Sequence, residues 1–324
     1  MNYGKKSVSR KRNSLISRTA MMGKRAHVSF IRVLFAVLIT ICVVVGCIGI
    51  GAFRGIIDNA PDVNDIDISP LGYATFLYDG DGNQLRKLTA PSSNRLPVSI
   101  DQIPVDLQHA VVAIEDERFY EHNGIDVRGI LRAFVKNITS GDLSEGASTI
   151  TQQLARNIFT DYLPYTDKSY SRKVKEIFRA LEFEKNYTKT QILELYLNMI
   201  YLGSGCGGVE TAAEYYFGKS AKDLTAAESA CIIAITNNPS LYNPKYERTY
   251  TRKDGTTITP RELNKQRQEL ILDKMAEIVN PDTGKPYLTK EECEAAKAEP
   301  LNFTDTSGDA SELVKTDGIE INNW

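Results

Sequence analysis

The chain has 324 residues, of which 42% are hydrophobic and 25% are charged, and its formal net charge is −2. This composition excludes an intrinsically disordered chain and is sufficient for one core with attached segments. The charge is unevenly distributed. Residues 1–32 hold nine basic residues and no acidic residue, which leaves 30 basic against 41 acidic residues in the rest of the chain.

An apolar run of 21 residues, Val33 to Phe53, follows this basic tail. At the rise of an α-helix the run is long enough to cross a hydrocarbon core of about 30 Å. A cleavable signal peptide is the alternative, but the run exceeds the usual apolar region of about 7–15 residues and no clean cleavage site follows it. We therefore expect an uncleaved transmembrane anchor at 33–53 in the cell membrane. Basic residues favour the cytoplasmic side, which predicts a cytoplasmic tail at 1–32 and an extracellular remainder. Topology and anionic lipid account for the tail, so no nucleic-acid partner is expected.

The segment after the anchor predicts a stalk and then a β-hairpin. Residues 54–70 are acidic and contain proline, as a stalk does. Strand-like runs at 73–78 and 84–88 flank Asp79-Gly80-Asp81-Gly82-Asn83, which is a strong turn signal. The turn resembles part of a calcium loop, but it lacks the later ligands and the terminal Glu, which favours turn chemistry.

From about residue 106 the apolar spacing becomes helical. Helices are expected to end after Ile114, to include 130–138, to begin near Ser148, and to cover 171–185, 188–199, 225–235, 261–279 and 290–298. Capping-box spacing marks two of these starts, Thr188 with Gln191 and Thr225 with Glu228. The fold is therefore expected to be mostly α. We expect one domain at 71–247 and, at 248–324, a helical extension that begins a linker to a C-terminal domain missing from this chain.

Three cysteines follow the anchor, Cys206, Cys231 and Cys293. No pair has C-x-x-C spacing, so a zinc site is not expected. A Cys206–Cys231 disulfide is one alternative in an oxidising exterior. Buried free thiols are the other, and we favour them slightly.

Residues 114–124 read Ile-Glu-Asp-Glu-Arg-Phe-Tyr-Glu-His-Asn-Gly, with four carboxylates at the end of an apolar helix. Apolar side chains and other acids favour the protonated form of a carboxylate, which makes it a better general base near neutral pH. Glu115 directly follows the buried-face residues Val111 and Ile114, so we expect it to point into a cleft as the general base. A solvated acidic helix end with Phe119 as an apolar plug is the alternative.

Residues 146–157 read Gly-Ala-Ser-Thr-Ile-Thr-Gln-Gln-Leu-Ala-Arg-Asn, where hydroxyls, amides and one guanidinium replace the usual Glu and Lys of a surface helix. A helix beginning near Ser148 would present free N–H groups to an anion. It would also bring together four polar side chains, those of Thr149, Gln152, Gln153 and Arg156. Such a face suits sugar hydroxyls and phosphate oxygens. A polar helix capped by Ser148 is the ordinary alternative.

Arg172 and Glu176 lie four residues apart, a spacing that surface ion pairing explains by itself. Together, however, the three segments supply two separated carboxylates, a face of hydroxyls and amides, and several cations. These are the groups required to move a sugar from a pyrophosphate leaving group.

Five ordered motifs contain these residues. They are E-D-x-x-F-x-x-H-x-G at 115–124, G-x-S-T-I-T-Q-Q at 146–153, R-K-x-x-E at 172–176, I-L-E-x-Y-L-N with Y-x-G at 192–203, and G-x-x-x-A-A-x-x-Y-F-G-K at 208–219. In this order they resemble the motifs of the peptidoglycan glycosyltransferases, glycosyltransferase family 51, found in class A penicillin-binding proteins and in monofunctional transglycosylases. The resemblance covers about residues 70–300 and implies a mostly α, lysozyme-like fold.

The resemblance also implies an activity, the polymerisation of lipid II at the outer membrane surface. The 4-hydroxyl of the acceptor N-acetylglucosamine attacks C1 of the donor N-acetylmuramic acid, inverts it and releases undecaprenyl pyrophosphate. The implied partners are lipid II, the growing glycan strand, the membrane and other cell-wall synthesis proteins.

By position in the motifs, Glu115 is implied as the general base, and Glu176 as a second carboxylate that assists the leaving group or positions the acceptor. The implied substrate-binding residues are Asp116, Phe119, His122, Ser148, Thr149, Gln152, Gln153, Arg156, Asn157, Arg172, Lys173, Glu194 and Asn198. A divalent cation, Mg²⁺ or Mn²⁺, is expected beside Asp116 and the pyrophosphate, and no organic cofactor is expected. Arg156 stands where many relatives carry Lys, so the geometry of phosphate binding is expected to differ.

No Ser in the chain has Lys three residues on, and no K-T-G occurs, so we expect no transpeptidase site in this chain. A truncated class A protein is expected, with a monofunctional enzyme as the rival. Two other functions stay open, a lysozyme-like lytic hydrolase and a non-catalytic membrane scaffold that binds lipid II. The apolar residues at 158–165 could contact lipid or pack in the core.

Overall fold

The computed structural model describes residues 4–16, 27–44, 47, 51, 74–88, 94–140, 146–159, 170–252, 254–281 and 283–305. The chain divides into two compact units, Met1–Ala60 and Pro61–Trp324. Each unit is described by itself.

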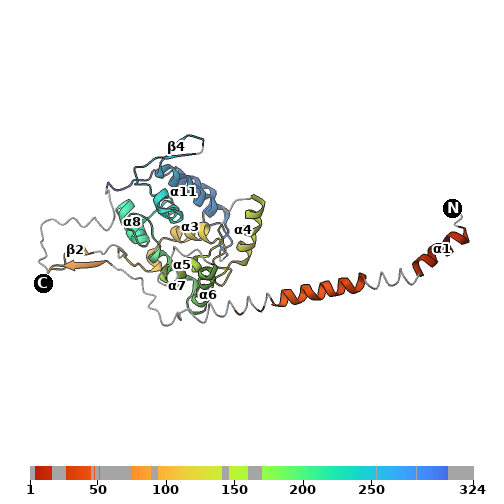
Figure 1. Ribbon diagram of the computed structural model, residues 1–324. Coiled ribbons are helices and arrows are strands. Elements are labelled where there is room, and N and C mark those ends of the chain that lie inside the picture. The colour runs from red at the N-terminus through yellow and green to blue at the C-terminus, as the bar shows by residue number, and fades with distance from the viewer. Residues whose placement is uncertain are drawn as a thin grey trace. The chain divides into compact units, whose positions relative to one another are not determined.

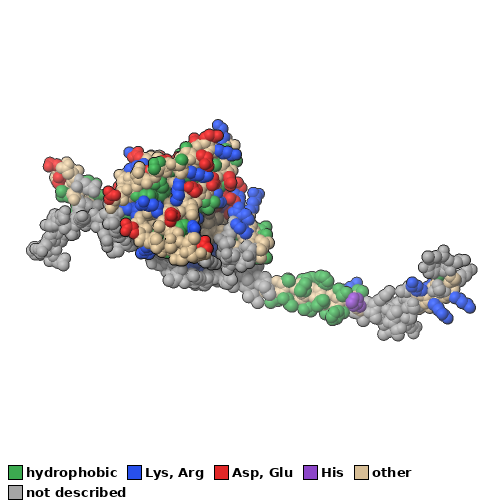
Figure 2. Space-filling model, turned by 90° about the horizontal axis from the view of Figure 1, so that it is seen from above, with side chains coloured by type: hydrophobic (Ala, Val, Ile, Leu, Met, Phe, Trp, Pro, Cys, Tyr) green, Lys and Arg blue, Asp and Glu red, His purple; other side chains and the backbone are tan. Residues whose placement is uncertain are grey.

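The described residues of the first unit include α1 (Lys5–Ile16) and an apolar helix at His27–Val44. The second has a mean hydropathy of 2.4 over 18 residues, and its side chains are exposed. Hydrophobic side chains cover its visible face (Figure 2). Its length and composition suit a membrane span, and a signal sequence near an N-terminus meets the same criteria. The predicted anchor extends to residue 53, and seven of its last nine residues (45, 46, 48–50, 52 and 53) lie outside the described part.

The predicted hairpin is present in the second unit. Strand β1 (Thr75–Tyr78) pairs antiparallel with β2 (Gln84–Leu88). The Asp79 carboxylate accepts the backbone N–H groups of Asp81 and Asn83 at 2.9 and 2.7 Å and the side-chain amide of Asn83 at 2.9 Å. These bonds, led by that of the Asn83 side chain, lower the pKa of Asp79. The carboxylate is occupied by its own turn, as turn chemistry requires.

The rest of the second unit is helical, which confirms the mostly α prediction (Figure 1). Its α-helices are α3 (Val105–Glu115), α4 (Val127–Ser140), α5 (Ile150–Ile158), α6 (Tyr170–Asn186), α7 (Lys189–Met199), α8 (Val209–Phe217), α9 (Ala226–Ala234), α10 (Pro239–Tyr242), α11 (Pro260–Glu277) and α12 (Lys290–Ala298). The segments between them contain three short 3-10 helices, η2 (Ile100–Gln102), η3 (Ala221–Asp223) and η4 (Ile235–Asn237). They also contain a two-residue antiparallel pair of strands, β3 (Tyr250–Thr251) with β4 (Thr257–Ile258).

Threonine caps fix where several of these helices begin. The predicted capping boxes at Thr188 and Thr225 are both present, with each hydroxyl accepting the N–H three residues on. The helix expected to begin near Ser148 is present, but Ser148 is not its cap. Thr149 has extended backbone and accepts the N–H of Gln152, so Thr149 is the N-cap and α5 begins at Ile150.

One hydrophobic core joins the helices from α3 to α12. Helix α9 is buried along almost its whole length, and it packs against both α3 and α11. The same core includes fully buried Leu107, Ile192, Ile232 and Ile271, together with nearly buried Ala296 on α12. The division expected at residue 247 therefore does not coincide with a break in this core.

A smaller cluster lies between α5 and α6, where Ala155, Phe159 and Phe183 are buried together. Ile158 packs against it, so the described part of the apolar run at 158–165 packs in the core. Residues 160–165 lie outside the described part. Cys206, Cys231 and Cys293 are buried free thiols, as favoured, and burial raises the pKa of Cys231.

Candidate active site

A cavity of about 380 Å³ lies at the C-terminal end of α3. Its walls come from α3, from the residues before α5, from η4 and from α11, with Glu115, Ser148, Asn237 and Arg267 among the lining side chains. The Glu115 side chain is 15% exposed. The predicted cleft beside Glu115 is therefore present.

The Glu115 carboxylate is held at both oxygens. Gln153 Nε2 donates to Oε2 at 2.8 Å, and Thr236 Oγ1 donates to Oε1 at 2.7 Å. The Tyr196 hydroxyl donates to Gln153 Oε1 at 3.0 Å and so fixes the orientation of that amide. Arg267 Nη2 lies 4.0 Å from Glu115 Oε1. These contacts fix the carboxylate in one orientation while leaving it open to the cavity.

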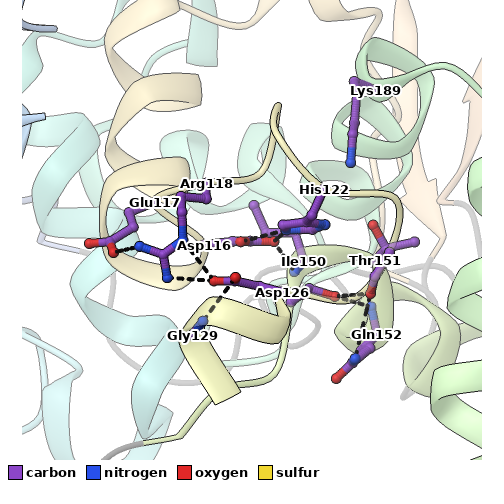
Figure 3. A network of polar contacts seen from close by, with 12 residues as sticks. Asp116, Glu117, Arg118, His122, Asp126, Gly129, Ile150, Thr151, Gln152 and Lys189 are labelled. Carbon is purple, nitrogen blue, oxygen red and sulfur yellow. Dashed lines mark hydrogen bonds and ion pairs between the residues drawn. The ribbon is translucent and has the colours of Figure 1, made fainter. Parts of the chain in front are cut away.

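Asp116 connects the first motif to the start of α5. His122 Nε2 contacts Asp116 Oδ1 and Oδ2 at 2.9 and 3.0 Å, and the Ile150 N–H donates to Oδ2 at 3.0 Å (Figure 3). With Thr149 taking the N–H of Gln152, two N–H groups of the first turn already have partners. The expectation that this helix start presents them to a substrate anion is therefore wrong, because a protein carboxylate uses the positive helix end instead.

A divalent cation does not fit at Asp116. Its side chain is 3% exposed, and both oxygens accept hydrogen bonds from His122 or Ile150. Within the described ranges, ligand atoms of three potential metal ligands gather at Asp273, Cys293 and Glu294, on α11 and α12. The ammonium group of Lys297 already binds these carboxylates, because its Nζ lies 2.5 Å from Asp273 and 2.9 Å from Glu294.

Arg118 links α3 to α4 beside the cavity. Its Nε and Nη2 donate to Asp126 Oδ2 at 3.1 and 2.6 Å, and Asp126 Oδ1 accepts the Gly129 N–H at 2.9 Å (Figure 3). Glu117 forms ion pairs with Arg118 and with Arg132 on α4. Burial alone would raise the pKa of Glu117, but these ion pairs outweigh it and the pKa is lowered. The network was not predicted, although Arg118 and Glu117 lie inside the first motif.

A second polar cluster lies where α5 faces α6. Lys173 Nζ donates to Ser148 Oγ and Gln152 Oε1, both at 2.9 Å, and to Glu176 Oε2 at 3.2 Å. Arg172 pairs with the other oxygen of Glu176. Burial lowers the pKa of Lys173, and Glu176 opposes that shift. Glu176 is 1% exposed, so this carboxylate contacts cations and does not line the cavity.

The polar side chains of α5 do not form the single face that was expected. Gln153 turns to Glu115, while Gln152 is buried against Lys173. Thr149 is also buried, and its hydroxyl donates to the Gly124 carbonyl at 2.8 Å. Arg156 and Asn157 lie in the last turn of α5 and are half-buried.

Three other expected binding residues have partners or packing within the protein. Phe119 is fully buried, as the plug interpretation predicts. Glu194 accepts the Ile100 N–H at 2.8 Å, and Asn198 bonds both the N–H and the carbonyl of Val98. These contacts hold the segment before α3 against α7.

The lining residues missed from the sequence include Arg267 and Lys274, and the bond from Thr236 to Glu115 was missed as well. Arg267 and Lys274 are seven residues apart, so α11 presents both on one face. That spacing was the available signal. Thr236 follows an apolar helix and gave none.

Comparison with known proteins identifies the family. The family model described as "Transglycosylase" matches residues 81–276. Penicillin-binding protein 4 of Bacillus subtilis is 39% identical over 229 residues, covering 67% of this chain and 36% of that protein. Penicillin-binding protein 1A of Escherichia coli is 40% identical over 248 residues, covering 73% and 28%. A chain named as a transglycosylase in Cupriavidus necator is 44% identical over 206 residues, covering 64% and 78%.

The chain thus spans about a quarter to a third of the length of the penicillin-binding proteins it matches. The match includes Glu115, the α5 and α6 motifs, and almost all of α11. This chain belongs to the transglycosylase family, the peptidoglycan glycosyltransferases.

Proposed function

We propose that this protein polymerises lipid II into glycan strands. Glu115 takes the proton of the acceptor 4-hydroxyl, whose oxygen forms a bond to C1 of the donor N-acetylmuramic acid. The bond from C1 to the phosphate oxygen breaks with inversion, and its electron pair leaves with undecaprenyl pyrophosphate. The observation that carries the proposal is a half-buried carboxylate at a cavity wall, oriented by Gln153 from the second motif.

The basic side chains that lie where α5 faces α6 are proposed to bind the leaving pyrophosphate. The Lys173 side chain is 37% exposed and bonds Ser148, which lines the cavity. Arg156 and Arg172 are near enough to act on Lys173, since both add to the lowering of its pKa that burial causes. We assign Glu176 to holding Arg172 and Lys173 in place, because it touches both and is buried. Cations preorganised in this way stabilise charge as it develops on a phosphate.

The membrane is the proposed location, with the N-terminus cytoplasmic and the catalytic domain outside. The apolar helix His27–Val44 supports an anchor, and the basic residues before it support this orientation. Helix α4 adds a second apolar surface, formed by the exposed side chains of Val127, Ile130, Leu131, Phe134, Val135 and Ile138. Exposed side chains of this kind beside an active site suit an enzyme with a lipid-linked substrate. Cell-wall synthesis proteins are the proposed protein partners.

The test is polymerisation of lipid II by the full chain and by Glu115→Gln, which keeps the shape and removes the base. We expect a loss of at least about 100-fold in kcat. The matched control is Glu121→Gln, because Glu121 belongs to the same motif and its side chain is 53% exposed. It lies 3.6 Å from the exposed Arg128 side chain. The control is expected to keep the parent rate. A Glu115→Gln variant as active as the parent would contradict the mechanism and favour a non-catalytic scaffold.

A second arm separates polymerisation from lysis. The parent is incubated with finished glycan strands in place of lipid II. A polymerase leaves these strands at their original length, whereas a lytic hydrolase releases soluble fragments. Fragments that appear with the parent and disappear with Glu115→Gln would replace the proposed activity by hydrolysis.

A further inference from the structure

The Thr236 hydroxyl lies between two acceptors, one of which is the Glu115 carboxylate at the cavity wall. Its Oγ1 is 2.7 Å from Glu115 Oε1 and 2.8 Å from the carbonyl oxygen of Ile233. A threonine hydroxyl has one hydrogen, so it donates to only one of them at a time, and it can also accept. Thr236 lies outside the five motifs, 121 residues from Glu115 along the chain.

The other oxygen of Glu115 has a partner that cannot change its role. Gln153 donates to Oε2, and the Tyr196 hydroxyl donates to the amide oxygen of Gln153. The contact with Tyr196 keeps the NH₂ group directed at Glu115, and an NH₂ group only donates. Oε2 therefore keeps a donor in both protonation states, whereas the partner of Oε1 can switch from donor to acceptor.

We infer that Thr236 is a positioning residue whose hydroxyl hydrogen turns from Glu115 to the Ile233 carbonyl when Glu115 takes a proton. This inference rests on the proposed function. Before the reaction, the hydroxyl donates to ionised Oε1. After the acceptor O–H bond breaks and its proton reaches Oε1, the new carboxylic O–H donates to Thr236 Oγ1. Both states are fully bonded and no heavy atom has to move, so Glu115 keeps its position throughout the transfer.

The switch predicts a change in pH dependence when the hydroxyl is removed. The other acids that line the cavity are Asp116, Glu117 and Asp126, and its bases are Arg118, Arg132, Arg267 and Lys274. Thr236→Val leaves all of them in place. A hydrogen bond to an ionised acceptor is about twice as strong as one to a neutral group, so losing the hydroxyl disfavours ionised Glu115 more than protonated Glu115. The acidic limb of the rate profile is expected to move to higher pH by about half a unit to one unit.

The experiment measures lipid II polymerisation by the full chain across this pH range. For Thr236→Val we expect kcat to fall about tenfold, with KM for lipid II within about twofold of the parent, because positioning affects the proton transfer and not binding. Thr236→Ser keeps the hydroxyl and is expected to restore both kcat and the profile. The matched control is Thr211→Val, on α8, where the buried hydroxyl has no partner among the described residues. It is expected to behave as the parent.

A readout without turnover separates this inference from the proposed function. Infrared difference titration follows the carboxyl band that Glu115→Gln removes, and its midpoint should be higher in Thr236→Val than in the parent. A parent-like kcat, profile and midpoint in Thr236→Val would overturn the inference, as would Thr236→Ser behaving like Thr236→Val. Thr236→Ala replaces the valine variant if that variant does not melt cooperatively. A parent that fails to polymerise lipid II contradicts the proposed function alone, and the titration then decides the role of Thr236.

Discussion

Arg118 is shared by two carboxylates, and this arrangement makes the site sensitive to acid. Burial by itself would raise the pKa of Asp126, but the hydrogen bonds from Arg118 and the Gly129 N–H outweigh it, so the pKa lies below its ordinary value of 3.8. The unfolded chain therefore binds this proton more tightly than the folded protein. The resulting stabilisation is fully present above the ordinary pKa and is lost as the pH falls through the lower, folded value.

We predict that Asp126→Asn lowers the free energy of unfolding by about 1–2 kcal/mol at pH 7, and that the difference from the parent shrinks as the pH falls below 4. Urea unfolding at several pH values measures both effects. Asp223→Asn, at an exposed acid on η3, is the control and should match the parent throughout. A difference that stays constant down to pH 3 would exclude an ionised Asp126 as its source.

Gly124 occupies a position that other residues cannot take without strain. Its φ is +86°, and a Cβ there would lie 2.9 Å from the Ala180 carbonyl oxygen on α6. Gly124→Ala is expected to destabilise the protein by at least about 2 kcal/mol, because the left-handed backbone and the close contact both cost energy. The melting temperature measures this loss. Gly146→Ala is the matched control, since a Cβ at Gly146 meets nothing within 4 Å, and an equal loss in both variants would contradict the argument.

At this scale the sequence predicted Glu115 and its cavity, because a carboxylate after a buried helical face points inward. It did not predict Thr236, which reaches Glu115 only through the packing of α9 against α3. Glu194 and Asn198 lie in a motif, and in the structure both bond the backbone at residues 98–100. A spacing pattern shows that a residue is required, but it does not distinguish binding of substrate from binding of backbone.

Among the elements, α4 differs most from its sequence interpretation. Its apolar spacing predicted a helix, and the helix is there, but six of its large apolar side chains are exposed. Periodicity identifies an apolar face and does not say what covers it. Helices α7 and α9 were predictable with their starts, because capping boxes are local. The N-cap of α5 was not, since the choice between Ser148 and Thr149 depends on the tertiary contacts of Thr149 with Gly124 and of Asp116 with Ile150.

Lipid contact by α4 can be measured by fluorescence quenching. We predict that Phe134→Trp, placed in a chain in which Trp324 is Phe, is quenched by brominated lipid in vesicles, because the Phe134 side chain is 61% exposed on the apolar face. Leu270→Trp in the same background is the control, at a side chain 46% exposed on α11. A several-fold stronger quenching at 134 than at 270 is expected. Equal quenching at both positions would mean that α4 is not the lipid-facing surface.

On the scale of the whole molecule, the helical part after residue 247 completes the core that holds the active site. Ile271, Leu272 and Met275 of α11 are fully buried in it, and α11 packs against α3, which ends at Glu115. The sequence predicted both terminal helices but assigned them to an extension after the domain. Helix length and caps are local properties, whereas membership of a core depends on which faces meet.

This arrangement predicts that a chain ending at residue 247 will not fold, whereas one ending at residue 305 will. Each of the three α11 side chains contributes about 2–5 kcal/mol on the scale of large-to-alanine substitutions, and their sum is comparable to the whole stability of a typical domain, about 5–15 kcal/mol. Cooperative melting, followed by circular dichroism in detergent, measures the outcome. Met275→Ala in the full chain checks the same cause without truncation and should lower the melting temperature. A chain ending at 247 that melts cooperatively and polymerises lipid II would show that α11 only covers the core, and that Arg267 and Lys274 are dispensable for the reaction.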